Sequence, residues 1–454
     1  MTAIASYFRS LPERYGRRTL ILLAAIAVLG LGLRAYAVVH PVADPADDSH
    51  AYYALSKALY EEGSFGGPAF HDSSDWSPGA PFLYAASYVV TGGAREGTAR
   101  IVEALLGVAT ILVVFALGWR LGGRRLGRWT GLFAAFAVAV YPPFLHTTGE
   151  LMSEPPAMLT LPAAILAFLW AGERESAWAW LVPGLLFGLT AMFRPEYLLV
   201  AAAFVVLAAI RAGLGGEWRG GFAGAAVLLL AIVLPILPWT IRNLVVLERV
   251  VPISTGGGKA LYVGTFYPAD GEYQKVKATL YQRQTGRSLP PFSQALNEVN
   301  PTPLFNRVAG RYPELPRDSA LGKLGRRNLS QYFGEDPIGY LGMTARKVGR
   351  IWSSGVGEAM NTTAGRIVQL LLVFAGLAGL VALGLWRRWW ELLALATPIV
   401  LVTLVGAVSL ATPRRNEVLM TLIFPLAGLA LSSALTAISS GREWSPQQAS
   451  SRPN

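Results

Sequence analysis

The sequence contains no cysteine and carries little charge. None of its 454 residues is a cysteine, which excludes disulfides, thiolate nucleophiles and cysteine-ligated metal sites. Only 15% of the residues are charged, against about a quarter in an average soluble domain. Histidine is also rare, and the four histidines match no zinc-binding spacing. With 53% hydrophobic residues, this composition indicates a polytopic membrane protein.

Motifs for nucleotides and nucleic acids are missing as well. The chain has neither a Walker motif nor a Rossmann glycine fingerprint, so nothing indicates a nucleotide-driven reaction. The net charge of +11 fits arginine-rich cytoplasmic loops beside an anionic lipid bilayer, and we expect no nucleic-acid partner. We expect no cofactor. A divalent metal is compatible with the composition, but no residue pattern indicates one.

Ten apolar segments approach the roughly 20 residues that a membrane-spanning helix needs. They cover residues 19–39, 98–119, 129–147, 155–171, 177–193, 195–211, 221–241, 366–386, 391–411 and 418–438. The fifth and sixth segments meet with almost no loop, so each of them could be a short or re-entrant helix that does not cross the membrane fully. "AYA" at 35–37 would suit signal-peptide cleavage, but Arg34 and the loop charges favour a retained span. Arginines fall in alternate connections, so the positive-inside rule places both termini in the cytoplasm.

These spans divide the chain into successive parts. An N-terminal transmembrane module, residues 1–243, contains a first outer loop at 40–97. An extracytoplasmic segment, 244–365, closes with an amphipathic stretch that predicts an interfacial helix. The C-terminal transmembrane helices cover 366–438, and a polar tail at 439–454 is predicted to be disordered in the cytoplasm.

The first outer loop carries a dense acidic stretch, "DPADDSHAYY", directly outside the first span. Apolar residues from Ala51 onward recur at helical spacing, which predicts a short amphipathic helix on the membrane surface. Either Asp47 or Asp48 suits the N-cap of this helix. The other could act as a general base, because the membrane boundary desolvates it and the neighbouring carboxylate tunes it.

Other charged residues lie at the outer ends of spans, on the same face as Asp48. They are Glu150, Glu154, Arg194, Glu196, Arg242, Arg414 and Arg415. Charge at membrane depth is costly and is functional by default. A local ion pair between Arg194 and Glu196, or a snorkelling Arg242, is the simpler explanation for those residues.

Arginine binds phosphate well, because its guanidinium donates paired charge-assisted hydrogen bonds. The glycine-rich "STGGGKALYVGT" could add backbone N–H groups and a lysine to the same anion. The predicted phosphate ligands are Arg194, Arg242, Lys259 and Arg414. The predicted substrate contacts are Tyr52, Glu150, Glu154 and Glu196.

Several segments together resemble the GT-C membrane glycosyltransferases, in the branch of protein O-mannosyltransferases and lipid A aminoarabinose transferases. They are "DDSHAYYALSKALYEEGSF", "SPGAPFLYA", "ARIVEALLGVATILVVFALGWRLGGRR", "GELMSEPPAML", "FRPEYLLV", "PWTIRNLVVLERVVPISTGGGKALYVGT" and "DPIGYLGMTARKVGRIW". Each motif is loose, but their order and their placement on one face are specific. The match extends over residues 20–430.

This resemblance implies an α-helical polytopic membrane protein: a bundle of about ten transmembrane helices with interfacial helices and an extracytoplasmic segment. It implies an enzyme of the cytoplasmic membrane with its active site facing outside. Such an enzyme moves a hexose or pentose, with inversion, from a polyprenyl-phosphate donor to a glycan, lipid or protein acceptor. Alignment on Tyr52 places the family's catalytic aspartate on Asp48, and a shift of one residue would place it on Asp47.

Two departures from the family pattern concern individual residues. The second acidic position of the family's usual acidic pair is Ser49 in this chain, so the role of that pair stays open. The family often has arginine, aromatic, arginine before the last span. This chain has Arg414, Arg415 and Asn416 instead, which leaves phosphate binding by Arg414 open.

Two other classes of protein also fit part of the sequence. Ten spans with charged residues suit a lipid or sugar transporter or flippase. Against this, the chain shows no internal repeat, and its charges gather at one edge rather than at the bilayer midplane. A non-catalytic assembly protein of the same fold is the second alternative, and it would tolerate the loss of Asp48.

Overall fold

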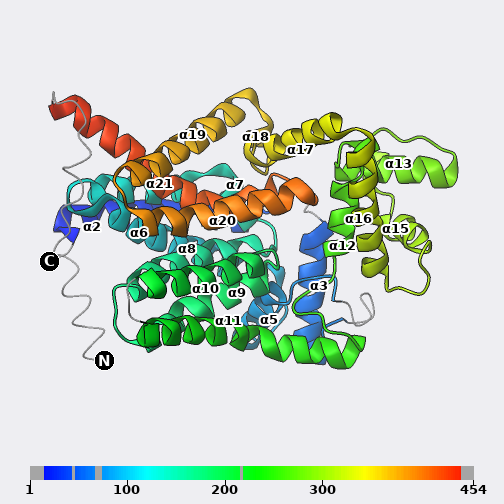
Figure 1. Ribbon diagram of the computed structural model, residues 1–454, viewed down its shortest axis with the longest axis horizontal. Coiled ribbons are helices and arrows are strands. Elements are labelled where there is room, and N and C mark those ends of the chain that lie inside the picture. The colour runs from blue at the N-terminus through cyan, green and yellow to red at the C-terminus, as the bar shows by residue number, and fades with distance from the viewer. Residues whose placement is uncertain (1–14, 43–46, 67–73, 215–217, 441–454) are drawn as a thin grey trace.

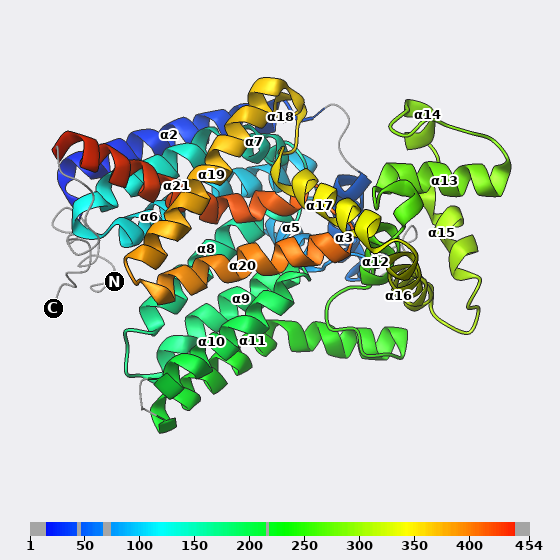
Figure 2. The ribbon, with the colours of Figure 1, turned by 45° about the horizontal axis from the view of Figure 1, so that its top comes forward.

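The structure is a helical bundle with a group of shorter helices at one end. The computed structural model describes residues 15–42, 47–66, 74–214 and 218–440, and every regular element in these ranges is a helix. Long helices run side by side, and the shorter ones cover one end of the bundle (Figures 1 and 2). The start of α2 (Arg17–Val39) and the end of α21 (Arg414–Ser440) lie at the opposite end.

Eight helices in the described part of the chain are long and apolar enough to cross a membrane. They are α2, α6 (Glu96–Val140), α8 (Glu154–Ala171), α10 (Tyr197–Leu214), α11 (Trp218–Leu247), α19 (Thr363–Leu385), α20 (Trp389–Val408) and α21. Many of their apolar side chains are exposed, as expected of surfaces that face lipid. These helices confirm the predicted α-helical, multi-pass architecture.

Helix α6 contains two apolar arms joined by a sharp turn. At Gly123 the backbone has φ 60° and ψ −157°, a conformation that essentially only glycine adopts. A Cβ atom on Gly118 would lie 2.9 Å from the Cα of Gly131, so the arms pack side by side at close range. The arms correspond to the separate spans predicted at 98–119 and 129–147.

Two predicted spans are shorter than expected. The one at 129–147 ends early because two prolines interrupt it, and the chain continues as the short helix α7 (Pro142–Thr148). The one at 177–193 is a 3-10 turn, η1 (Ala177–Trp180), followed by α9 (Leu181–Phe193). The 13 residues of α9 reach about 20 Å, less than the roughly 30 Å hydrocarbon core of a bilayer. Together with η1 the apolar segment covers Ala177–Phe193, and whether it crosses fully stays a prediction.

The first outer loop forms α3 (Asp47–Glu62) and α5 (Gly79–Thr91). The amphipathic helix predicted there is α3, but its environment differs from the prediction. Tyr52 and Leu55 are buried in the protein, with Tyr52 in a small aromatic cluster that includes Tyr84 of α5. The apolar face of α3 thus packs on the protein core and does not lie on the membrane surface.

The segment between α11 and α19 folds into helices with a core of their own. Its elements are α12 (Gly257–Gly264), η2 (Tyr267–Ala269), α13 (Tyr273–Thr285), α14 (Gln294–Asn297), α15 (Pro301–Ala309), α16 (Arg317–Glu335), α17 (Pro337–Trp352) and α18 (Glu358–Asn361). Phe266, Phe305 and Leu321 lie in that core. The predicted closing helix is α17, on which Ile338 and Leu341 are exposed. Of the predicted tail, 439–454, the structure describes only the first two residues, which end α21. The remainder lies outside the described residues.

Candidate active site

A network of charged side chains lies where α3, α8 and α21 begin. Helix α3 stands at the end of the bundle next to the shorter helices of residues 257–361, here called the outer helices (Figure 1). It joins residues from the first outer loop, the α8 start, the α9–α10 connection and the last span. All of these residues belong to the set predicted from charge at the outer ends of spans. Helix packing brings them together over long distances in the chain.

Glu154 stands at the centre of this network, and hydrogen bonds to the preceding loop fix its position. The backbone N–H of Leu151 donates to the Ser49 hydroxyl at 3.0 Å, and that of Met152 donates to Glu103 Oε1 at 2.9 Å. Two prolines follow Glu154 in the first turn of α8, where a missing N–H costs no helical hydrogen bond. Glu154 therefore enters the site from a rigid helix start, where a carboxylate also suits the helix dipole.

Two arginines converge on one oxygen of Glu154. Arg194 Nη1 lies 2.5 Å from Glu154 Oε1, and Arg414 reaches the same oxygen with Nη2 at 2.8 Å and donates from Nε at 3.0 Å. The Glu154 side chain has no exposed surface. A buried carboxylate is tolerable only when it is paired in this way.

Asp48 joins the network through Arg414. Arg414 Nη1 donates to Asp48 Oδ2 at 2.5 Å. The Asp48 side chain is 32% exposed, whereas that of Glu154 is fully buried. Of the two carboxylates that contact Arg414, Asp48 is therefore the one that a ligand can reach. Asp47 begins α3, but its side chain lies outside the described part of the chain. The contacts can therefore be compared with the prediction for Asp48 only, and a catalytic role for Asp47 stays a prediction.

Glu196 extends the network on the other side of Arg194. Arg194 donates to Glu196 Oε1 from Nε at 3.0 Å and from Nη2 at 2.7 Å, and Arg415 Nη1 lies 3.9 Å from that oxygen. Burial alone would raise the pKa of Glu196, but the two guanidinium groups outweigh burial and lower the pKa to about 2. Glu196 is thus ionised at neutral pH. The simple Arg194–Glu196 ion pair is real, but it is one link of a larger arrangement.

Tyr52 lies next to the network. Its hydroxyl is 3.3 Å from Ser77 Oγ, and its ring packs edge-on against Trp76. Burial, and then the charges of Asp48 and Glu154, raise the pKa of Tyr52 above its ordinary value. The phenol therefore keeps its proton and remains a hydrogen-bond donor near Asp48.

Glu150 is buried near the same loop but faces another partner. Its Oε1 lies 4.0 Å from His146 Nε2, four residues earlier in the chain. The contacts that hold Glu154 in the network do not include Glu150. Substrate contact by Glu150 stays a prediction.

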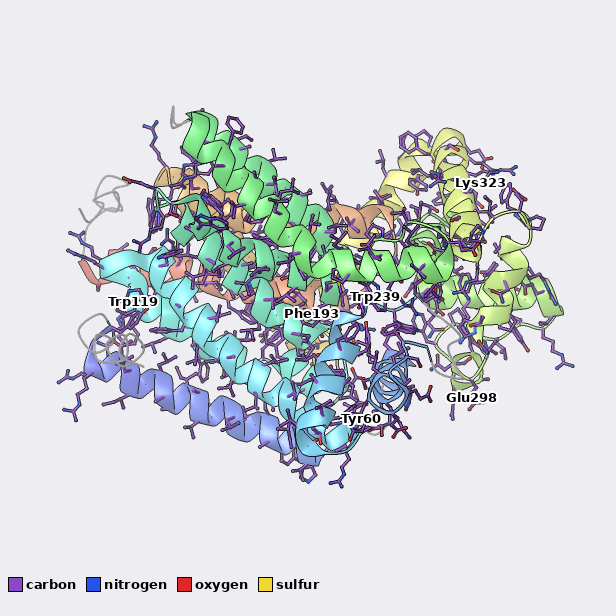
Figure 3. The ribbon with its side chains drawn as sticks, turned by 90° about the horizontal axis from the view of Figure 1, so that it is seen from below. Tyr60, Trp119, Phe193, Trp239, Glu298 and Lys323 are labelled. Carbon is purple, nitrogen blue, oxygen red and sulfur yellow. The ribbon has the colours of Figure 1, made fainter. Side chains whose placement is uncertain are left out.

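Arg242 and Lys259 make their contacts elsewhere. Arg242 Nη2 donates to the carbonyl of Phe65 at 2.9 Å, and its guanidinium lies over Trp239, which Figure 3 labels where α11 approaches the outer helices. The Lys259 ammonium lies over the ring of Phe305, 5.1 Å from its centroid, inside the outer helical segment. Neither of these contact sets includes a member of the network.

The carboxylates of the network face guanidinium groups. Among the described residues, no three histidine, aspartate or glutamate side chains gather as metal ligands would. In this arrangement the accessible carboxylate of Asp48 lies directly beside the guanidinium of Arg414, which Glu154 holds in place. This pairing suits the removal of a proton next to a bound anion.

Glu103 supports the site, and the sequence reasoning above did not single it out. It is fully buried in α6, where its carboxyl group accepts hydrogen bonds from the Tyr84 hydroxyl and from the backbone N–H of Met152. The signal was available, because Glu103 interrupts the apolar run "ARIVEALLG" and an ionisable residue inside a span marks a site by default. Ser49, which departs from the acidic pair of the family, holds the same loop.

The fold defines a class of protein: the chain has the fold of the GT-C membrane glycosyltransferases. Residues 75–239 match the family model described as dolichyl-phosphate-mannose-protein mannosyltransferase. That range contains Glu154 and Arg194 but neither Asp48 nor Arg414. No curated protein sequence matches the chain significantly.

Solved structures share the fold at low sequence identity. The oligosaccharyltransferase AglB from Archaeoglobus fulgidus, in complex with an inhibitory peptide and a dolichol-phosphate, is similar with a TM-score of 0.54 and 16% identity over 96% of this chain and 53% of that one. The apo form of the Archaeoglobus fulgidus oligosaccharyltransferase gives 0.55 and 17% over 97% and 54%. ArnT from Cupriavidus metallidurans, bound to undecaprenyl phosphate, is a weaker likeness at 0.40 and 13% over 92% and 79%. The chain thus spans about half the length of the oligosaccharyltransferases that it matches.

Proposed function

We propose that this protein is a membrane glycosyltransferase that moves a sugar from a polyprenyl-phosphate donor to an acceptor outside the cytoplasm. The observation that carries the proposal is the contact between Asp48 and Arg414 at the end of the bundle, with Glu154 and Arg194 behind it. It places a reachable carboxylate beside a fixed cation. The dolichol-phosphate in the similar AglB complex supports a lipid phosphate as the donor's leaving group.

In the proposed reaction Asp48 is the general base. It takes the proton of an acceptor hydroxyl while that oxygen attacks the anomeric carbon of the sugar. The new glycosidic bond forms as the bond from that carbon to the phosphate oxygen breaks, and the configuration inverts. The electron pair leaves with the polyprenyl phosphate, which changes from a phosphodiester monoanion to a monoester. No nucleotide is needed, because the donor arrives activated.

Arg414 is the primary candidate for the donor phosphate. All of the donating nitrogens of Arg194 point at carboxylates, so Arg194 is better suited to hold Glu154 in place. We leave Arg242 and Lys259 out of the proposed phosphate site. Arg242 donates to the Phe65 carbonyl and lies over Trp239, Lys259 lies over Phe305, and none of these partners belongs to the network. A hydrogen-bond donor that stabilises the charge developing on a leaving group is important for the rate. Removing one such donor raises the activation barrier by about 3 kcal/mol.

We further propose that the site faces the outside of the cytoplasmic membrane. Arg120 and Arg388, two of the arginines from the alternate connections, lie together at the ends of spans, where Arg388 donates to a backbone carbonyl at Arg120. The positive-inside rule then makes their side cytoplasmic and the side of the network external. A glycan, lipid or protein could reach Asp48 there.

The test is transfer by the purified protein in lipid nanodiscs. A panel of radiolabelled polyprenyl-phosphate sugars is offered with membrane extract as the acceptor source, and consumption of one donor identifies the sugar. We expect Asp48→Asn to retain less than about a hundredth of the wild-type rate, because a general base contributes roughly 100- to 10,000-fold. Asp336→Asn is the control, since Asp336 caps α17 and asparagine caps a helix equally well.

Two outcomes would contradict the proposal. If Asp48→Asn keeps more than about a tenth of the wild-type rate, proton removal belongs to another group. If no donor is consumed while network residues become alternately accessible from both sides of the membrane, the protein is a transporter.

A further inference from the structure

One arginine of the network serves two carboxylates of unequal burial. Arg414 contacts Glu154 with Nε at 3.0 Å and Nη2 at 2.8 Å, and it contacts Asp48 with Nη1 at 2.5 Å. The Glu154 side chain is fully buried, whereas that of Asp48 is 32% exposed. Exposed ion pairs are weak and exchange readily, while a buried charge cannot leave its partner without a large loss. The bond to Asp48 is therefore the one that a ligand can replace.

This bond conflicts with free action of Asp48 as a base. While Arg414 Nη1 donates to Asp48 Oδ2, that oxygen is occupied and cannot accept the proton of an acceptor hydroxyl in the same direction. A donor phosphate placed beside Asp48 also needs a guanidinium, and Arg414 is the one in contact there. The two anions therefore compete for the same cation.

The charge balance of the network points the same way. Counted over the side chains that the structure describes, its ion pairs join as many carboxylates as guanidinium groups: Asp48, Glu154, Glu196, Arg194, Arg414 and Arg415. A phosphodiester adds a further negative charge to this balanced set. Like charges at a few ångströms in a partly desolvated site repel strongly, so the carboxylate with access to solvent has to give way.

We propose that the donor phosphate replaces Asp48 on Arg414, so that donor binding itself frees the catalytic base. The inference rests on the proposed glycosyl transfer and adds an order to it, with the donor binding before the acceptor is deprotonated. Glu154 holds the other edge of the guanidinium, so Arg414 stays in place while its outer partner changes. The exchange swaps one hydrogen-bonded anion for another and breaks no covalent bond.

The experiment measures the affinity of the purified protein in nanodiscs for a polyprenyl monophosphate. Asp48→Asn removes the competing charge, so we expect it to bind the lipid phosphate about three- to tenfold more tightly than wild type, the gain from releasing a partly exposed ion pair. Asp48→Glu keeps the charge and should bind within about twofold of wild type, on the same reasoning.

Two further variants separate this mechanism from general charge effects. Asp270→Asn frees Arg346 and Arg350 in the outer helices and should leave the affinity unchanged. Adding Arg414→Gln to Asp48→Asn should abolish the gain, because the cation that was released is then absent. A gain in the first control, or a gain that survives in the double variant, would overturn the inference.

The result is distinguishable from failure of the proposed function. Loss of turnover with tighter phosphate binding in Asp48→Asn supports both. Loss of turnover with unchanged or weaker binding overturns the exchange at Arg414 and leaves the glycosyltransferase proposal standing. Retained turnover in Asp48→Asn removes Asp48 as the general base, whereas a wild-type protein that consumes no donor overturns the proposed function. Asp48→Glu is a second variant, and it keeps the negative charge at this position. If Asp48→Glu binds the lipid phosphate as tightly as Asp48→Asn does, the exchange at Arg414 is also overturned.

Discussion

Replacing Glu154 by glutamine perturbs the buried centre of the network. The Glu154 side chain has no exposed surface, and its Oε1 contacts both Arg194 and Arg414. Removing one partner of a buried ion pair costs about 3–5 kcal/mol, because the remaining charge loses its compensation without regaining water. Each arginine keeps a second carboxylate and the amide oxygen still accepts a hydrogen bond, so we expect the lower end, about 3 kcal/mol.

The same substitution at an exposed ion pair supplies the control. Glu173 is 57% exposed and its Oε1 lies 2.7 Å from Arg120 Nη2, so Glu173→Gln should cost only about 0–1 kcal/mol. Both free energies of unfolding are measured in detergent by titration with SDS, with tryptophan fluorescence as the signal. If Glu154→Gln is no more destabilising than Glu173→Gln, burial does not set the energy of this network and the reasoning is refuted.

The remaining predictions concern pH and packing. Burial, and then neighbouring arginines, lower the pKa of Lys347 to about 7, against about 10.4 in an unfolded chain. Between these two pKa values Lys347 is neutral in the folded protein and protonated in the unfolded chain. Because the unfolded state then binds one more proton, the stability of the wild type should rise relative to Lys347→Met from about pH 7 to about pH 10. A constant difference in Tm across that range would contradict the assignment. A Cβ on Gly379 would lie 2.2 Å from the carbonyl oxygen of Leu426, so Gly379→Ala should destabilise the protein by about 1–3 kcal/mol. Gly32→Ala meets nothing within 4 Å and should be neutral or slightly stabilising, and equal effects of the two alanines in the unfolding assay would be inconsistent with this packing.

Local features of the sequence predicted the helices well and their surroundings less well. Apolar runs located the spans, because hydropathy needs no knowledge of neighbours. The helical spacing after Asp48 predicted α3, but the same apolar face can lie on lipid or on protein, and the structure packs Leu55 into the core. The hairpin in α6 depends on the backbone conformation of Gly123, which the arginine-rich stretch around it indicated only as a loop.

For the site, the sequence placed the charged residues at one end of the spans but did not pair them. Arg242 and Arg414 were equivalent by position, and the departure from the family pattern left Arg414 the less certain of the two. The structure gives Arg414 to Asp48 and Arg242 to the carbonyl of Phe65. Glu103 was passed over because a lone carboxylate in an apolar run names no partner.

The sequence by itself determined that this chain crosses a membrane many times through helices and gathers charge at one edge, since both follow from the order of apolar and polar residues. Only the tertiary structure decided which charges meet. Asp48 and Arg414 are 366 positions apart, and their contact depends on how α3, α8 and α21 pack. Packing angles and helix rotations arise from the whole set of interlocking side chains, so no local stretch of sequence encodes them.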